Sequence, residues 1–380
     1  MTKRIVVLTS SRADYGIYRP LLKKLRDDVA FELTIVAFGT HLSRFHGYTI
    51  QQIQDDDFGK IETVESMLLT DSPESIATAM GLTTQKMAVL WARLSTQTDL
   101  IICLGDRYEM LAAVLATVPF NLPVAHLHGG ETTLGAIDDT FRHCLTLIAT
   151  LHFTATVAYA QRVSQLKGAA TNVHCVGALS LDNLLEMKLL SPIEFQEKFG
   201  IDLSIPTILT TFHPETVAVE ANERYALEVS KALQELAKTR QVLITMPNAD
   251  TAGTFIRQAF QALAVRNSNV ILVENLGSLG YFSAMKHCTF LLGNSSSGII
   301  EAASLGKFAI NLGQRQAGRA RSQNVLDVPI EAAAIEASVR QIDQQPVFTG
   351  VNVYQANHSA ADSIIKILKQ MEVTSVKEKQ

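Results

Sequence analysis

Short apolar runs alternate with longer amphipathic segments along almost the whole chain. The runs are rich in Val, Ile and Leu, and they cover residues 4–9, 32–38, 99–104, 122–127, 151–155, 206–212, 241–246 and 289–292. Apolar runs of this length are typical of parallel strands that are buried on both faces. The segments between them have the spacing of helices that lie on a sheet. The pattern predicts an α/β fold built from parallel sheets.

The chain has 380 residues, which is too many for one ordinary core and suits two domains. The alternation of strands and helices begins again near residue 206. We expect an amino-terminal domain at residues 1–176 and a carboxyl-terminal domain at residues 177–358. A final amphipathic helix is expected at residues 359–372, followed by a polar tail at residues 373–380.

Composition excludes several classes of function. A net charge of −4 gives no indication of nucleic-acid binding. The first residues lack the apolar core of a signal peptide, and no apolar run approaches the roughly 18 residues of a membrane-spanning helix. The four cysteines are scattered without a C-x-x-C pair, and Cys103 and Cys175 lie within apolar runs, which favours buried thiols. We therefore expect a cytoplasmic protein without membrane or nucleic-acid partners.

Titratable side chains gather where successive segments of the first half begin or end. The candidates are Asp106, Arg107, Glu109, His128, Glu131, Asp138, Arg142 and His143. The carboxyl ends of parallel strands meet at one edge of a sheet, where ligands bind in α/β proteins. For any one segment alone, an ordinary loop ion pair or a plain turn at Gly129-Gly130 explains the residues equally well. Three such segments within forty residues indicate a cleft with several acid/base groups.

The loop after the first predicted strand has no G-x-G-x-x-G motif, so a nicotinamide cofactor is not expected. It offers Ser10, Ser11 and Arg12 instead. The loop after the second strand contains His41 and His46, which are either substrate contacts or surface residues.

The glycine- and serine-rich loop at residues 293–298 is the best candidate for a phosphate site. It precedes a predicted helix at residues 299–304, and backbone N–H groups at a helix start attract anions. A plain serine cap is the alternative. Arg315, Arg319 and Arg321 follow the next strand and can add positive charge toward a diphosphate.

Together these motifs resemble one family, the hydrolysing UDP-N-acetylglucosamine 2-epimerases. The resemblance covers roughly residues 4–330 in unbroken order. It rests on Ser11-Arg-Ala-Asp-Tyr15, Gly105-Asp-Arg107, Gly129-Gly-Glu131, Asp138-Asp139, Arg142-His143, Phe212-His-Pro214, Pro247-Asn248, Gly293-Asn-Ser-Ser296, Glu301 and Asn311-Leu-Gly-Gln-Arg315.

The resemblance implies two Rossmann-like domains that face each other across a cleft, the GT-B arrangement, with the final helix returning to the first domain. It implies that a UDP-sugar substrate loses UDP as H2 is removed, and that water adds to the glycal to give a free mannosamine-type sugar for sialic or legionaminic acid. It implies no cofactor, no metal, and a homodimer or homotetramer.

The chemistry also explains the residue types, because proton removal and return need acid/base groups and the departing diphosphate needs positive charge. Asp106, Asp138 and His213 suit the first need, with Arg142 beside them. By carry-over, the UDP contacts are Arg12, Asn248, Ser295, Ser296, Ser297, Glu301 and Arg315. The better-known members carry a catalytic glutamate at the position of His128, so either His128 or Glu131 takes that role here.

Two other functions fit the same residues. A GT-B glycosyltransferase with a UDP-sugar donor needs an acceptor, whereas an epimerase does not. A non-catalytic sensor of UDP-sugars binds without turnover, but it does not need so many titratable groups. The substituents at C4 and C6 of the sugar stay open, and relatives with the His-Gly-Gly-Glu form include enzymes for 2,4-diacetamido-6-deoxy sugars.

Overall fold

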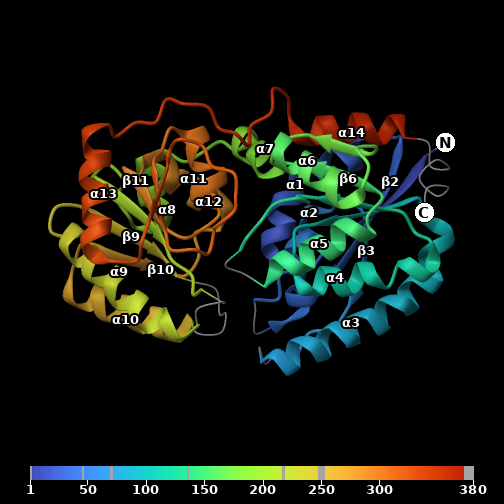
Figure 1. The fold of residues 1–380 in the computed structure, drawn as a ribbon, viewed down its shortest axis with the longest axis horizontal. Coiled ribbons are helices and arrows are strands. Elements are labelled where there is room, and N and C mark those ends of the chain that lie inside the picture. Colours follow the sequence, from blue (N-terminus) through green and yellow to red (C-terminus); the bar gives the residue numbers. More distant parts are fainter. Residues whose placement is uncertain are drawn as a thin grey trace. The chain divides into compact units, whose positions relative to one another are not determined.

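A computed structural model describes residues 2–44, 47–68, 72–134, 137–215, 219–246 and 253–371. These residues form two compact units (Figure 1). The first unit takes the described residues within 1–131, 138–183 and 356–380, and the second takes those within 132–137 and 184–355. Each unit is built around its own parallel sheet, which confirms the predicted α/β class.

The first sheet has seven parallel strands in the order β3-β2-β1-β4-β5-β6-β7. The strands are β1 (Lys3–Thr9), β2 (Phe31–Phe38), β3 (Lys60–Val64), β4 (Leu100–Leu104), β5 (Val124–Leu127), β6 (Leu151–Thr154) and β7 (Val173–Cys175). The chain reverses its direction of travel across the sheet between β1 and β4. Such a switch point leaves a crevice at the carboxyl ends of the strands.

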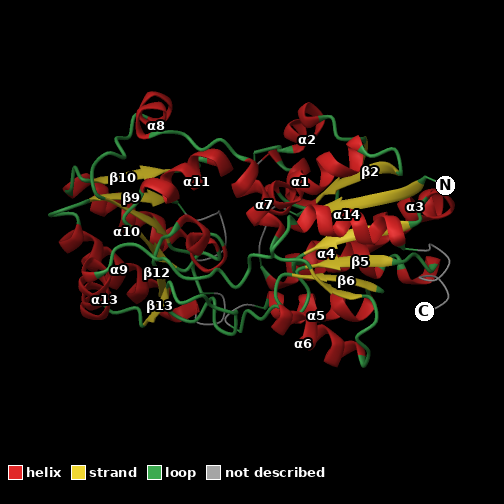
Figure 2. Cartoon of the chain, turned by 90° about the horizontal axis from the view of Figure 1, so that it is seen from above, coloured by secondary structure: helices red, strands yellow, loops and turns green. Residues whose placement is uncertain are grey.

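Helices cover both faces of this sheet (Figure 2). They are α1 (Arg12–Asp27), α2 (Ile50–Asp56), α3 (Pro73–Leu94), α4 (Tyr108–Leu115), α5 (Asp138–Ile148), α6 (Val157–Lys167), α7 (Leu179–Glu186) and α14 (Ala360–Gln370). Successive strand residues point to opposite faces, so Ile5 and Val7 pack under α1 and α14, whereas Val6 and Leu8 pack under α3 and α4. This explains why the strands are apolar throughout.

The second sheet repeats the topology with six parallel strands in the order β10-β9-β8-β11-β12-β13. The strands are β8 (Thr207–Thr211), β9 (Gln241–Thr245), β10 (Val270–Val273), β11 (Phe290–Gly293), β12 (Ala309–Leu312) and β13 (Val325–Val328). The helices are α8 (Pro192–Phe199), α9 (Asn222–Leu236), α10 (Gly253–Arg266), α11 (Gly277–His287), α12 (Ser297–Ile300) and α13 (Ala332–Gln344). Its switch point lies between β8 and β11.

Local capping sets several helix boundaries. Ser11 accepts a bond from the N–H of Asp14 and opens α1 with a capping box, in which the Asp14 carboxylate reaches back to Ser11. Ser191 and Glu194 form a second box at the start of α8. Gly200 ends α8 in the left-handed conformation that favours glycine.

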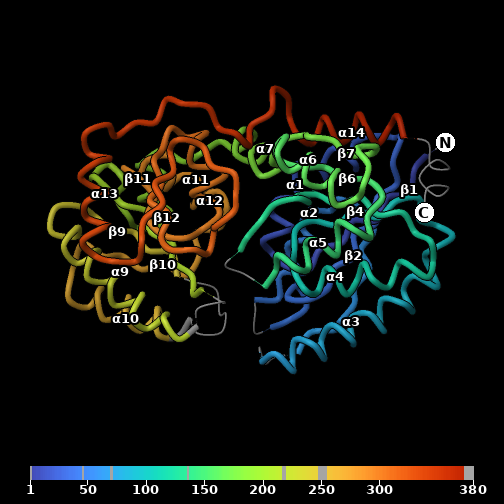
Figure 3. The backbone as a smooth tube through the Cα atoms, viewed as in Figure 1, coloured from blue at the N-terminus to red at the C-terminus, as the bar shows by residue number. Residues whose placement is uncertain are grey.

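The last helix, α14, belongs to the first unit (Figure 3). Its start is held by Asp182, whose carboxylate accepts bonds from the N–H groups of Ala360 at 3.1 Å and Ala361 at 2.7 Å. At its end, the ammonium group of Lys3 donates to three terminal carbonyls. Because Ile364 and Leu368 are fully buried, α14 forms part of the core beside α1.

The apolar runs predicted as strands lie within two residues of the observed strands at both ends. The sequence also predicts a helix at residues 73–94 and a helix that begins at Asp138, and α3 and α5 confirm both. The pattern misses β13 and α2. The acidic run at residues 55–57 predicts a solvated turn, but Asp55 and Asp56 end α2. Cys175 is exposed, contrary to the prediction of a buried thiol, because β7 is an edge strand. All four cysteines are free, and no helix among the described residues is long and apolar enough to cross a membrane.

Two buried histidines lie side by side on β5 and β6. His126 and His152 are partners in the register of these strands, and both are almost fully buried. Burial lowers the pKa of His126 to about 4 and that of His152 to about 3. Both imidazoles are therefore neutral in the folded protein at neutral pH.

These pKa values predict a loss of stability in mild acid. The unfolded chain protonates its histidines below about pH 6.5, whereas the folded chain does not. Stability is therefore complete above that pH and declines toward pH 4, by at most about 1.4 kcal/mol per pH unit for each histidine. His152→Leu should flatten this decline in urea-unfolding midpoints measured from pH 7 to pH 5. The exposed His358 provides the control, and equal slopes for His152→Leu and His358→Leu would contradict the assignment.

Candidate active site

The predicted strand-end residues of the first unit converge on one buried cluster. Asp106 follows β4, His128 and Glu131 follow β5, and Arg142 lies on α5. The guanidinium of Arg142 pairs with the carboxylate of Asp106 and with Glu131 Oε2 at 3.1 Å. It also donates to the carbonyl of His128 at 3.3 Å. The structure thus brings together four of the predicted catalytic residues.

His128 is bound directly to Glu131 within this cluster. The distance from His128 Nδ1 to Glu131 Oε1 is 2.7 Å. The other ring nitrogen, Nε2, is buried and has no hydrogen-bond partner among the described residues. Glu131 is 1% exposed and Arg142 is 2% exposed, so these two charges are shielded from water, whereas the Asp106 side chain is 25% exposed. In such surroundings electrostatic interactions are strong.

The loop that carries His128 has an unusual backbone. His128 has a φ of +63°, in the left-handed region where residues other than glycine are uncommon. Gly130 also has a positive φ, and a Cβ atom there would lie 2.5 Å from the carbonyl oxygen of Tyr159. The Gly-Gly pair is therefore needed for the chain to turn against α6. Strained backbone of this kind often marks a functional site.

His126 holds the loop after β4 in place. A carbonyl oxygen only accepts, so His126 Nε2 donates to Gly105 at 2.8 Å, and Nδ1 accepts from the hydroxyl of Thr146 at 3.2 Å. The low pKa of His126 keeps this neutral tautomer in place. His126 therefore fixes the residue that precedes Asp106.

Asp138 lies at the first turn of α5, partly exposed, where its charge helps to raise the pKa of Arg107. The largest contribution to that shift comes from Glu109, which Arg107 binds with both Nε and a terminal nitrogen.

His143 does not join the cluster around Arg142. Its Nε2 lies 3.5 Å from Asp139 and 3.0 Å from Arg162, between α5 and α6.

The loop after β1 has a structural role that the sequence analysis did not identify. The buried carboxylate of Asp14 accepts bonds from the side chains of Thr9 at 2.6 Å and Ser10 at 2.9 Å, and from two backbone N–H groups. Burial raises the pKa of Asp14, but His41 and these hydrogen bonds outweigh it and hold the pKa below its usual value.

His41 was predicted to be either a substrate contact or a surface residue, and its burial contradicts the surface alternative. It is fully buried, with Nε2 2.9 Å from Thr9 and Nδ1 2.8 Å from Thr49. Arg12 is the exposed first residue of α1. His46 lies outside the described residues, as does Asn248.

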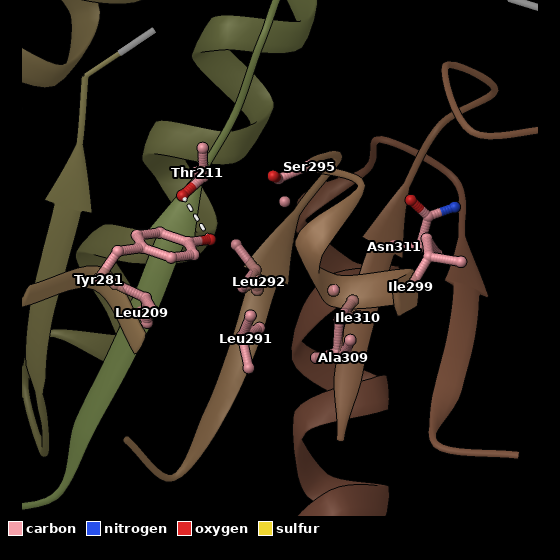
Figure 4. Close-up of a pocket in the computed structure, with 12 residues that line it drawn as sticks. Leu209, Thr211, Tyr281, Leu291, Leu292, Ser295, Ile299, Ala309, Ile310 and Asn311 are labelled. Atoms are coloured by element: carbon pink, nitrogen blue, oxygen red, sulfur yellow. Dashed lines mark hydrogen bonds between the residues drawn. The ribbon is translucent and has the colours of Figure 1, made fainter. Parts of the chain in front are cut away.

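The serine-rich loop of the second unit lies at the switch point between β8 and β11. Ser295, Ser296 and Ser297 are all partly exposed. The hydroxyl of Ser297 lies 2.7 Å from that of Tyr281 and 2.9 Å from that of Ser295. Tyr281 also reaches Thr211 at the end of β8, and these side chains line a narrow pocket with Asn311 (Figure 4). The site therefore presents a group of hydroxyls at one strand edge.

The helix predicted at residues 299–304 is shorter than expected. α12 spans only Ser297–Ile300, and a 3-10 turn follows at Ala302–Leu305. Gly293 has a φ of +143°, and a Cβ atom there would lie 1.9 Å from the carbonyl oxygen of Thr211, so only glycine fits. One helical turn has a weak dipole, so hydroxyl and backbone donors are the main attraction that this loop offers an anion.

Asn294 connects this loop to His213 and Arg315. Its side-chain amide accepts from the N–H of His213 at 2.7 Å and donates to its carbonyl at 2.8 Å. Its own carbonyl accepts from Arg315 at 3.2 Å. Burial, helped by the charge of Arg315, lowers the pKa of His213 to about 3. His213 is therefore a neutral imidazole at neutral pH.

The structure also places two other residues of the second unit, Arg321 and Glu301. Arg321 binds Asp327 and the carbonyls of Gln316 and Arg319, which gives it a structural role. Glu301 is 6% exposed at the end of α12. Among the described residues, no group of histidine, cysteine and carboxylate side chains is arranged to hold a metal ion.

Sequence reasoning missed Thr211, Tyr281 and Asn294. Thr211 and Asn294 follow directly from strand ends, so the same position rule that selected Asp106 applies to them. Tyr281 lies within α11, and no pattern in the sequence marks its approach to Ser297.

A wider hollow of about 540 Å³ lies on the α9 and α13 side of the second sheet. Two of its charged residues have local structural partners. Glu228 accepts from the N–H of Ala332 at the start of α13, and Glu215 accepts from that of Gln314.

Two Rossmann-type sheets, each with polar side chains at the carboxyl ends of its strands, define a protein of the GT-B-like structural class. The chain belongs to the UDP-N-acetylglucosamine 2-epimerase family, whose sequence pattern matches residues 23–369. The match covers most of both units.

Relatives of known name support this membership. The UDP-N,N'-diacetylbacillosamine 2-epimerase (hydrolyzing) of Legionella pneumophila is 33% identical over 354 residues, which cover 93% of this chain and 92% of that protein. The GDP/UDP-N,N'-diacetylbacillosamine 2-epimerase (hydrolyzing) of Campylobacter jejuni is 33% identical, covering 87% and 85%. The crystal structure of the Neisseria meningitidis UDP-GlcNAc 2-epimerase, bound to UDP-GlcNAc, has a TM-score of 0.81 at 18% identity and covers 97% of this chain and 100% of that one.

The cluster around Arg142 predicts a large effect on stability. Arg142→Met leaves the carboxylates of Asp106 and Glu131 without their shared cation, so the free energy of unfolding should fall by about 3–5 kcal/mol in urea titrations. Arg93→Met is the control, because the Arg93 side chain is 56% exposed where it pairs with Glu62, and such pairs contribute about 0–1 kcal/mol. Adding Asp106→Asn and Glu131→Gln to Arg142→Met should restore part of the loss. Equal losses for Arg142→Met and Arg93→Met would contradict this account of the cluster.

Proposed function

We propose that this protein is a hydrolysing UDP-sugar 2-epimerase, which converts a UDP-2-acetamido sugar to UDP and the free 2-epimer. The observation that carries the proposal is the buried cluster of Asp106, His128, Glu131 and Arg142 at the strand ends of the first sheet. Carbohydrate binding alone does not require two carboxylates and an imidazole on one buried guanidinium. Proton transfer at a sugar carbon does.

The reaction has two steps with balanced atoms. In the first, a base removes H2, the C2–H electrons form the C1=C2 double bond, and the C1–O bond breaks so that UDP leaves with its electrons. In the second, water adds a hydroxyl at C1 and a proton is delivered to C2 from the opposite face. The products are UDP and a free sugar that is inverted at C2.

The first unit supplies the proton-transfer groups in this proposal. A base and an acid are needed on opposite faces of the sugar, and Asp106, His128, Glu131 and Asp138 are the candidates. Asp138 suits exchange with solvent because it is partly exposed. Arg142 orders the cluster through its bonds to Asp106 and Glu131.

The second unit supplies the nucleotide site in this proposal. Ser295, Ser296 and Ser297 offer hydroxyl donors to the diphosphate, and Arg315 offers positive charge. Glu301 is proposed to accept bonds from the ribose hydroxyls. His213, as a neutral imidazole, is proposed to donate a hydrogen bond near the leaving phosphate. Arg12 and Asn248 stay predictions as further UDP contacts.

The names of the relatives suggest which sugar is turned over. UDP-N,N'-diacetylbacillosamine carries acetamido groups at C2 and C4 and lacks the C6 hydroxyl. UDP-N-acetylglucosamine carries an acetamido group at C2 and hydroxyls at C4 and C6. We propose the diacetamido sugar as the first substrate to test and UDP-N-acetylglucosamine as the second. Either product is a free mannosamine-type sugar, the kind of compound from which nonulosonic acids are built.

The reaction is tested by incubating the protein with each UDP-sugar in deuterated water and no added acceptor. We expect UDP release and one deuteron at C2 of the free sugar, by mass spectrometry. Asp138→Asn should lower turnover by about 10²–10⁴-fold, as for loss of a positioned acid or base. UDP release only with an acceptor would favour a glycosyltransferase, binding without turnover would favour a sensor, and full retention of hydrogen at C2 would exclude elimination.

The nucleotide site is tested by calorimetric titration with UDP. Arg315→Ala, or Ser296→Leu, should weaken UDP binding by about 1–3 kcal/mol, as for loss of a charge-assisted hydrogen bond. Arg340→Ala is the control, because Arg340 lies exposed on α13. If both site variants bound UDP as tightly as the control, the serine-rich loop would not be the nucleotide site.

A further inference from the structure

We propose that His128 and Glu131 act as a dyad, in which Glu131 orients the imidazole and His128 Nε2 is the base that removes H2. This inference rests on the proposed 2-epimerase function. It also assigns the role that the catalytic glutamate has in better-known members of the family. His128 takes this role, and Glu131 is a positioning residue.

The hydrogen bond between the two residues fixes the tautomer. Glu131 Oε1 lies 2.7 Å from His128 Nδ1, and a carboxylate oxygen only accepts, so Nδ1 carries the hydrogen. In the neutral ring the lone pair then lies on Nε2. That atom is buried and has no hydrogen-bond partner among the described residues, so none of these residues engages its lone pair.

Glu131 is not placed to act as the base itself. Oε1 is bound to His128 and Oε2 is bound to Arg142 at 3.1 Å. With both oxygens engaged, the carboxylate can take a sugar hydrogen only if one of these bonds breaks. Its position is that of the orienting acid in a catalytic triad, which holds an imidazole and stabilises the cation that forms.

The rest of the cluster holds the dyad in place. Arg142 binds the Glu131 carboxylate and the carbonyl of His128, so side chain and backbone are fixed by one guanidinium. The left-handed backbone of His128 and the Gly-Gly turn after it allow an imidazole to bend back onto a residue three positions later.

The charges balance when the base is protonated. The groups around His128 are Glu131 from its own loop, Arg142 from α5, Asp106 after β4, and the neutral His126 on β5. With the ring neutral, two carboxylates face one guanidinium. Transfer of H2 to Nε2 adds a second cation, so the cluster becomes neutral as the glycal forms and UDP departs. This proton returns to solvent after the free sugar leaves.

A double-mutant cycle tests the dyad in the full-length protein. Glu131→Gln permits the wrong tautomer, because an amide can donate to Nδ1, and it should lower kcat by about 10²–10⁴-fold with KM and UDP affinity nearly unchanged. His128→Gln should cost as much. The variant with both changes should be no slower than His128→Gln alone, because Glu131 acts only through His128.

Two readouts separate orientation from a merely structural role. Nitrogen NMR of protein labelled with ¹⁵N-histidine should show His128 protonated at Nδ1 in the wild type and partly at Nε2 in Glu131→Gln, without substrate. The second readout is the split between kcat and KM, because a loss of orientation lowers kcat and leaves KM nearly unchanged. Glu62→Gln and His174→Gln are matched controls in the same unit, and thermal melting confirms that each variant folds.

The outcomes distinguish the two proposals. Absence of UDP release by the wild type with every UDP-sugar would overturn the proposed function. Wild-type turnover with an unaffected Glu131→Gln would overturn the dyad alone. Losses that multiply in the double variant, or a loss confined to Glu131→Gln, would show that Glu131 acts independently of His128 and would likewise overturn it.

Discussion

The buried guanidinium of Arg142 is the interaction on which the first unit's site depends. It joins residues from three places in the chain, the loop after β4, the loop after β5 and α5 itself. A buried cation needs anionic partners, and buried carboxylates need a cation. Each residue therefore lowers the free-energy cost of burying the others. The result is a cluster in which both carboxylates pair with the same guanidinium.

The two sheets use the same topology for different chemistry. Both place polar loops at the carboxyl ends of strands at the switch point or beside it. In the first unit these loops carry carboxylates and an imidazole on a guanidinium, which suits proton transfer. In the second they carry hydroxyls and the side-chain amide of Asn294 that fixes His213, which suits recognition of an anion. The position of a site follows from the topology, but its chemistry follows from the few side chains that each loop supplies.

The fold and the cluster around Arg142 could be predicted from the sequence, because both follow from the local pattern of apolar and polar residues. Apolar runs mark buried parallel strands, and polar residues after them mark the carboxyl edge. What the pattern did not contain is the direction of each side chain. His41 and His143 look like His128 in sequence, yet His41 is bound between two threonines and His143 faces α6. β13 was missed because its four residues include an aspartate and are only partly buried, and α12 was overextended because helix propensity does not register the turn that follows it.

The return of α14 to the first unit affects the order in which the chain can fold during synthesis. Asp182 and Lys3 hold α14 at its two ends, and its apolar face fills part of the core beside α1. Domains generally fold as units from the amino terminus while the ribosome is still adding residues. Here the domain that begins first is completed last, because its core stays open until the entire second unit and the final helix have emerged. The second unit consists of residues 184–355 and the short segment at residues 132–137. All of it has been synthesised before α14, so it can fold while the first unit still lacks its last helix.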